Sequence, residues 1–63
     1  MFIEVTAKAV KQAWTINIKH IQFFYPYEQG TRIYFTYDDL PLDVTEDYET
    51  IKELIDRRLK GYD

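Results

Sequence analysis

Only the C-terminal part of the sequence has the periodicity of an amphipathic helix, and this restricts the folds open to the chain. At 100° per residue, an apolar face of roughly 140° collects Tyr48, Ile51, Leu54, Ile55, Arg58 and Leu59. Thr45 or Asp47 is placed to cap the start of this helix, and Gly61 to follow its end. A single helix covers one face of a sheet, so a sheet built from the remaining residues keeps its second face uncovered.

The residues before the helix alternate between apolar and polar side chains, as β-strands do. Strands are predicted over residues 2–7, 13–18, 21–25 and 31–37, with a short last strand over 42–44. Pro26 either ends the third strand or confines it to an edge or a bulge, because proline has no N–H for the ladder. Residues 28–30 are expected to form a turn in which Gly30 is free to take a positive φ, and residues 38–41 to form another turn.

The predicted fold class is therefore α+β. It consists of an antiparallel meander of four or five strands with one C-terminal amphipathic helix packed on one face. A chain of 63 residues is too short for two cores, so residues 1–63 are expected to form a single domain.

The chain lacks Cys and Ser and has a single His, which removes most catalytic and metal-binding constellations. Without Cys, disulfides and thiolate metal sites are excluded. No nucleophile stands beside an identifiable base, so we expect no enzyme, no catalytic residues, no metal, no cofactor and no small-molecule substrate. A domain this small is marginally stable, and its remaining support is an aromatic core or homo-oligomerisation.

No apolar run approaches the length of a membrane span, and no basic or apolar leader precedes the first predicted strand. We therefore expect a soluble cytoplasmic protein that is complete from its own start codon. Direct binding of nucleic acid is not expected, because the net charge is −3 and no basic stripe accompanies the aromatic residues.

Aromatic residues make up 17% of the chain, and alternation places some of them on the uncovered face. Three consecutive aromatic residues in one strand cannot all point the same way, although a bulge would turn more of them inward. Exposed apolar patches usually mark contact sites. We predict a non-catalytic interaction or regulatory module that contacts a protein partner, or itself as a homodimer, through Phe2, Phe24, Tyr25, Arg32 and Tyr34.

Charge is unevenly distributed along the chain. Residues 1–37 carry four basic and two acidic side chains, whereas residues 38–63 carry four basic and nine acidic ones. Such acids suit the solvated face and first turn of a helix. The alternative function is a small inhibitor that blocks a nucleic-acid-binding host protein with an acidic surface. Its contact residues would be Asp38, Asp39, Asp43, Glu46, Asp47, Glu49, Glu53 and Asp56.

Four groups of residues share their spacing with a known family. They are Ile3-Glu4-Val5-Thr6, Ile16-Asn17 with Ile21 and Phe24, Gly30-Thr31 with Ile33 and Phe35, and Val44 with Glu46, Asp47, Glu49 and Ile51. At these positions the chain resembles the small FlbD/SwrD-like proteins found with bacterial flagellar genes. The resemblance implies a strand-rich fold with a C-terminal helix, a link to flagellar function, and no catalytic residues. A similar scaffold also suits a mobile element or a phage.

Overall fold

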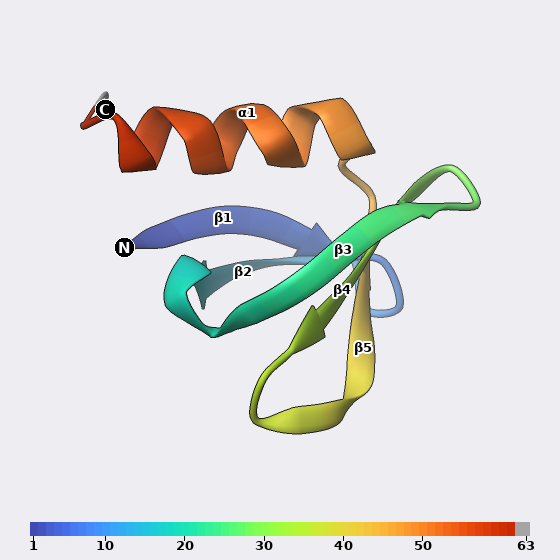
Figure 1. Ribbon diagram of the computed structural model, residues 1–63. Coiled ribbons are helices and arrows are strands. Elements are labelled where there is room, and N and C mark those ends of the chain that lie inside the picture. The colour runs from blue at the N-terminus through green and yellow to red at the C-terminus, as the bar shows by residue number, and fades with distance from the viewer. Residues whose placement is uncertain (62–63) are drawn as a thin grey trace.

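Five strands and one helix make up the computed structural model, which describes residues 1–61 (Figure 1). In chain order they are β1 (Phe2–Ala7), β2 (Gln12–Asn17), a 3₁₀ turn (Ile18–His20), β3 (Ile21–Tyr27), β4 (Gly30–Phe35), β5 (Asp38–Val44) and α1 (Tyr48–Leu59). All strand pairs are antiparallel, and α1 packs on the sheet. The predicted α+β class, with strands followed by one C-terminal helix, is confirmed.

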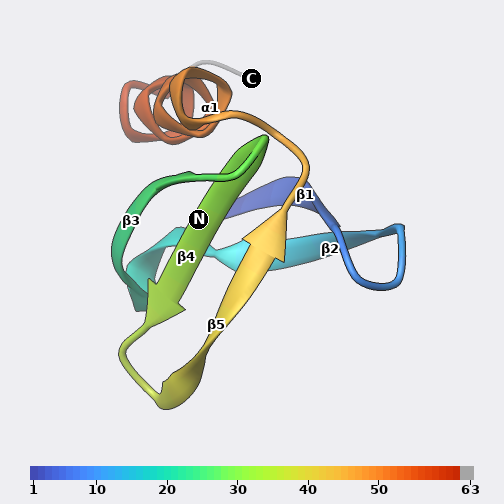
Figure 2. The ribbon, with the colours of Figure 1, turned by 90° about the vertical axis from the view of Figure 1, so that its right-hand side faces the viewer.

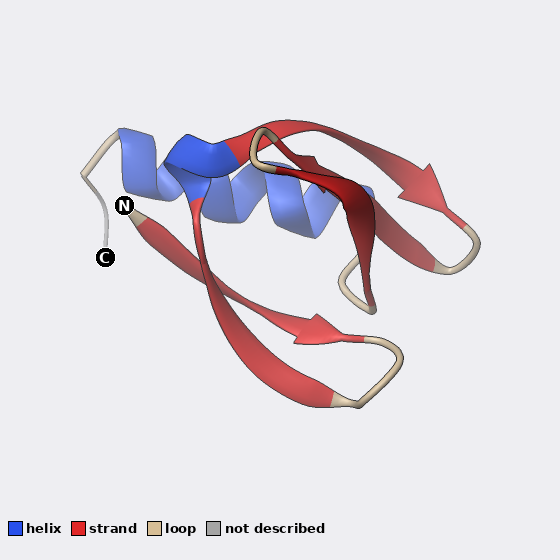
Figure 3. Cartoon of the chain, turned by 90° about the horizontal axis from the view of Figure 1, so that it is seen from below, coloured by secondary structure: helices blue, strands red, loops and turns tan. Residues whose placement is uncertain are grey.

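The strand order β2-β1-β5-β4-β3 forces the sheet to curl. In a flat sheet β2 and β3 would lie about 19 Å apart, at about 4.8 Å for each step between neighbouring strands. Only the 3₁₀ turn Ile18–His20 joins them, and such a turn rises about 2 Å per residue. The bend falls where β1 and β5 share the single pair Ala7↔Val44, and Figure 3 shows the β1–β2 hairpin diverging from the other strands there.

The core lies between the curled sheet and α1, which covers one side of it (Figure 2). Its fully buried members come from four elements: Val5, Ile33, Val44 and Ile51. Burial then decreases along α1, because Leu54 and Ile55 are only partly buried and Leu59 is 62% exposed. Leu59 lies on the apolar face by its spacing but is not buried, so the apolar contact of α1 with the sheet weakens toward its C-terminal end.

The ends of α1 agree with the sequence. The Asp47 carboxylate accepts a hydrogen bond from the Thr50 N–H at 2.8 Å and caps the first turn, while Gly61 follows the helix with φ of 78°. Thr45 is not the cap, because its N–H donates to the Thr6 carbonyl at 3.0 Å and continues the sheet. Of the two candidate caps, the structure selects Asp47.

Of the two predicted turns, the one near Gly30 is present and the one at residues 38–41 is not. Gly30 does not have a positive φ; Glu28 takes the left-handed conformation in that turn, with φ of 54°. Residues 38–41 are part of β5, and the chain reverses instead at residues 36–37, since Phe35 pairs with Asp38. The β4–β5 register shifts between Ile33 and Phe35, and this irregularity accommodates a proline in β5 at position 41.

Candidate functional site

Aromatic side chains form a strip on the face of β3 and β4 that points away from α1. We call Phe23, Tyr25, Tyr27, Arg32 and Tyr34 the outer strip. Alternation along β3 brings Phe23, Tyr25 and Tyr27 to one face, and cross-strand pairing places Tyr34 opposite Phe23 and Arg32 opposite Tyr25. The curl of the sheet leaves this face on the outside of the molecule.

The rings of the outer strip contact one another. Phe23 and Tyr34 stack with ring centroids 4.8 Å apart, Phe23 and Tyr25 with centroids 6.3 Å apart, and Tyr25 and Tyr34 lie 6.2 Å apart with tilted planes. Ring pairs at such distances attract each other beyond simple area burial. Phe23 is nevertheless 47% exposed and Tyr25 37% exposed, so the rings are held in place while part of each faces solvent.

Arg32 is fixed at one end of the outer strip. Its guanidinium donates to both carboxylate oxygens of Asp43 on β5, at 2.7 Å from Nε and 3.0 Å from Nη2, and lies 3.6 Å from the centroid of the Tyr27 ring. The hydrogen bond with Asp43 raises the pKa of Arg32 further, and the same bond holds the pKa of Asp43 below its usual range. The guanidinium is therefore a fixed, permanently charged group beside the rings.

The Tyr34 hydroxyl is the other group of the strip whose pKa is shifted. A side-chain hydrogen bond with Tyr25 raises the pKa of Tyr34, and partial burial adds to this shift, while the nearby guanidinium of Arg32 opposes it. Tyr34 therefore stays protonated in the neutral pH range. The strip presents polar groups, which would fix the orientation of a bound partner, next to apolar ring faces, which would supply binding free energy.

The structure brings together three of the five residues predicted for the aromatic face: Tyr25, Arg32 and Tyr34. Phe24 is a correction, since it points to the opposite side, packs against the core and lies 5.5 Å from the Tyr48 ring of α1. Phe2 is 53% exposed on the outward side of β1, but it belongs to the hairpin beyond the bend of the sheet.

Sequence reasoning missed two members of the strip, Phe23 and Tyr27. The signal was present, because Phe23, Tyr25 and Tyr27 are spaced by two residues, which is the period of one strand face. Phe24 falls between them and must face the other way. A spacing of two residues from Tyr25 places Phe23 and Tyr27 on the same face of β3 and Phe24 on the opposite face.

The eight carboxylates of the predicted acidic surface do not form one surface. Four of them have structural roles: Asp38 accepts from the Leu40 N–H, Asp43 binds Arg32, Glu46 binds Thr6, and Asp47 caps α1. The Glu46 carboxylate accepts from both the N–H and the hydroxyl of Thr6, at 2.8 and 2.9 Å, and so ties the start of the helical segment to β1.

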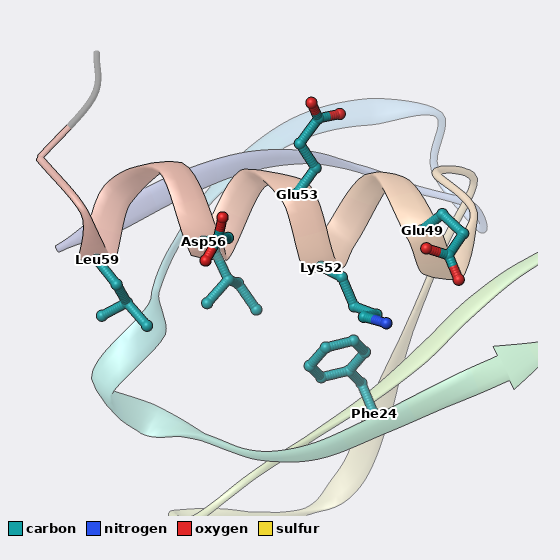
Figure 4. A pocket seen from close by; sticks show the side chains of 7 residues that line it. Phe24, Glu49, Lys52, Glu53, Asp56 and Leu59 are labelled. Carbon is teal, nitrogen blue, oxygen red and sulfur yellow. The ribbon is translucent and has the colours of Figure 1, made fainter.

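Three of the other acids, Glu49, Glu53 and Asp56, surround a shallow groove of about 480 Å³ between α1 and β3 (Figure 4). Its remaining lining residues are Phe24, Lys52, Ile55 and Leu59. Asp56 also forms an ion pair with Lys60 at 3.4 Å. The fourth, Asp39, lies on β5 near the turn that follows β4, and this turn is at the end of the molecule away from α1 (Figure 1).

No protein-family model, curated protein or solved structure matches this chain. Within residues 1–61, no helix has both the length and the apolar character needed to cross a membrane.

Proposed function

We propose that the protein is a non-catalytic interaction module that binds another protein, or a second copy of itself, through the outer strip. The observation that carries this proposal is the pre-ordered set of partly exposed rings on β3 and β4, together with a guanidinium fixed by Asp43. Tyr and Arg are the residue types that dominate the energetics of protein interfaces, and rigid rings lose little entropy on binding.

The contribution of one ring to the binding free energy follows from the ring area that is still exposed and that a partner can bury. A large aromatic side chain buries roughly 150–250 Å² in total, so a half-exposed ring has about 100 Å² left to bury. At about 25 cal/mol per Å², one such ring contributes about 2.5 kcal/mol. The loss of Phe23 alone should therefore weaken binding more than tenfold.

The acidic alternative is less well supported by the structure. Half of its carboxylates stabilise the fold itself, and Asp39 lies near the β4–β5 turn, which is at the end of the molecule away from α1 (Figure 1). The outer strip, by contrast, gathers its contact groups on two adjacent strands. We therefore assign the contact to the strip rather than to the acids.

The test compares three baits in quantitative affinity capture from the native host: the wild type, Phe23→Thr with Tyr34→Thr, and Leu40→Thr. Thr retains β-propensity, and Leu40 is a 73% exposed control on β5 outside the strip. Circular dichroism confirms that all three baits are folded.

The proposal predicts that the wild type and L40T both retain a protein that the F23T/Y34T variant loses. When this partner is purified, the wild type and L40T should bind it more tightly than F23T/Y34T does. If self-association is the function, the same ranking appears in sedimentation equilibrium of the purified chain. Equal retention of every captured protein by all three baits, together with equal sedimentation, would refute the proposal.

A further inference from the structure

The two edge strands of the sheet differ in how they are protected against pairing with another strand. β3 contains Pro26 and has a register irregularity between Ile21 and Phe23, and both features disrupt an edge. β2 is uncharged from Gln12 to Asn17, contains no proline and pairs with β1 in one unbroken register. β2 is therefore an edge that is open to a further strand.

The register shows which backbone groups of β2 point outward. The Ile18 N–H donates to the Met1 carbonyl at 2.9 Å, so this pair is hydrogen-bonded, and such pairs alternate along an antiparallel ladder. Residues 12, 14 and 16 then bond to β1, whereas Ala13, Thr15 and Asn17 direct their N–H and C=O groups outward. In Figure 3 the outer side of β2 lies at the border of the molecule.

We propose that β2 pairs antiparallel with β2 of a second copy of this chain, about a two-fold axis at Thr15. In this register Thr15 faces Thr15, and Ala13 faces Asn17 of the second copy. Every outward N–H and C=O of the three residues then has a partner. The edge is its own complement because its outward groups are placed symmetrically about Thr15, as an isologous interface requires.

The side chains favour the same register. Trp14 lies on the same face as Val5 and Ile16 but is 44% exposed, because no strand lies beyond it. In the proposed pair, Trp14 lies opposite Ile16 of the second copy, and each copy covers the other's indole. A chain this small, with no disulfide, gains stability from such a contact.

Two flanking lysines oppose the pairing in a way that can be measured. Antiparallel pairing brings Lys11, which precedes β2, to the same end of the interface as Lys19 of the second copy, so the dimer should strengthen as salt screens this repulsion. A foreign strand with acidic flanks would show the opposite salt dependence, because its binding would gain from those lysines at low salt.

The pairing involves β2, whereas the outer strip lies on β3 and β4, so the inference is independent of the proposed function. The dimer would carry two outer strips, one on each copy, which raises the apparent affinity for a partner that both strips can reach.

The test places charged side chains at Thr15, the residue on the proposed two-fold axis. Thr15→Lys places two ammonium groups opposite each other, and Thr15→Glu two carboxylates, so each variant alone should dimerise at least about tenfold more weakly than the wild type. An equimolar mixture of T15K and T15E should recover a dimer, since only the mixed pair joins opposite charges. Thr15 is exposed, so both variants should fold, which circular dichroism checks.

Sedimentation equilibrium separates the 7.7 kDa chain from a particle of twice that mass. Thr36→Lys and Thr36→Glu, at an exposed position in the turn between β4 and β5, are matched controls that should dimerise like the wild type. A wild type that stays monomeric up to about 1 mM, or a mixture that gives no dimer, overturns the inference. A dimer that persists in T15K but is lost in F23T/Y34T also overturns it and instead supports self-association through the outer strip.

Discussion

Substituting Gly30 by Ala should be the most damaging single-methyl change in the sheet. Gly30 is buried and lies where β4 runs against the end of β5. A Cβ added there would overlap the carbonyl oxygen of Val44, and it would lie 3.2 Å from the Val44 carbonyl carbon and 3.4 Å from the Thr45 Cα. The obstructing atoms are backbone, so no side-chain rotation relieves the overlap.

The backbone around Val44 has little freedom to move. Val44 pairs with Thr31 on one side and with Ala7 on the other, and its side chain is fully buried. Overpacking in a well-packed core costs roughly 1–3 kcal/mol, and a clash with a doubly paired strand belongs at the upper end. We expect a loss of about 3 kcal/mol from a domain whose total stability is on the order of 3–9 kcal/mol.

Urea and thermal denaturation followed by circular dichroism measure this loss, which corresponds to a decrease of about 12–24 °C in Tm for a domain of this size. Gly61→Ala is the matched control, because Gly61 has φ of 78° but no atom within 4 Å of an added Cβ. That control should lose only about 1 kcal/mol, from the left-handed backbone. If G30A were as stable as G61A or more so, close approach of β5 would not be the reason for glycine at position 30.

Further predictions concern the polar links of the fold. Arg32→Met and Asp43→Asn should each destabilise the protein, and the double variant should lose less than the sum of both, as measured by urea denaturation; additive losses would contradict a direct pair. Because its pKa is lowered, Asp43 contributes stability that is complete above the unfolded pKa of about 4 and is lost as the pH falls through the lowered folded value. The urea midpoint should therefore decrease less between pH 6 and pH 3 in D43N than in the wild type. Thr6→Val should cost about 1–2 kcal/mol by removing the hydroxyl bond to Glu46, whereas Thr6→Ser should retain most of it; equal losses would assign the effect to packing instead.

The sequence predicted the elements of the fold because their signals are local. The period of two in β1 and β4, the period near 3.6 in α1 and the cap at Asp47 each depend on a few neighbouring residues. The curl of the sheet depends instead on the pairing of Ala7 with Val44, which are 37 positions apart. No local pattern encodes such a pairing, so the strand order could not be read from the sequence.

The same difference between local signals and long-range pairing explains why Gly30 does not have a positive φ. A glycine in a turn suggests a positive φ, which is a local property, but the reason for glycine here is the approach of a distant strand. The turn predicted at residues 38–41 failed for a related reason. Its Asp and Pro are typical of turns, yet the pairing of Phe35 with Asp38 places them in β5.

The candidate site was predicted in part. Tyr25, Arg32 and Tyr34 lie together as expected, because alternation within β3 and β4 is a local signal. The wrong assignment of Phe24 and the omission of Phe23 came from one ambiguity, since a run of three aromatic residues does not show which of them face inward. Ring contacts across the strands resolve it.

The most direct measurement of the central claim is the footprint of the bound protein on the aromatic rings. Ring-proton signals from the isotopically labelled chain are compared by NMR between the free state and the complex. The account predicts that the signals of Phe23, Tyr25 and Tyr34 shift or broaden on binding while those of Phe24 and Phe35, on the side of α1, stay in place. Changes confined to the rings facing α1, with an unperturbed outer strip, would contradict it.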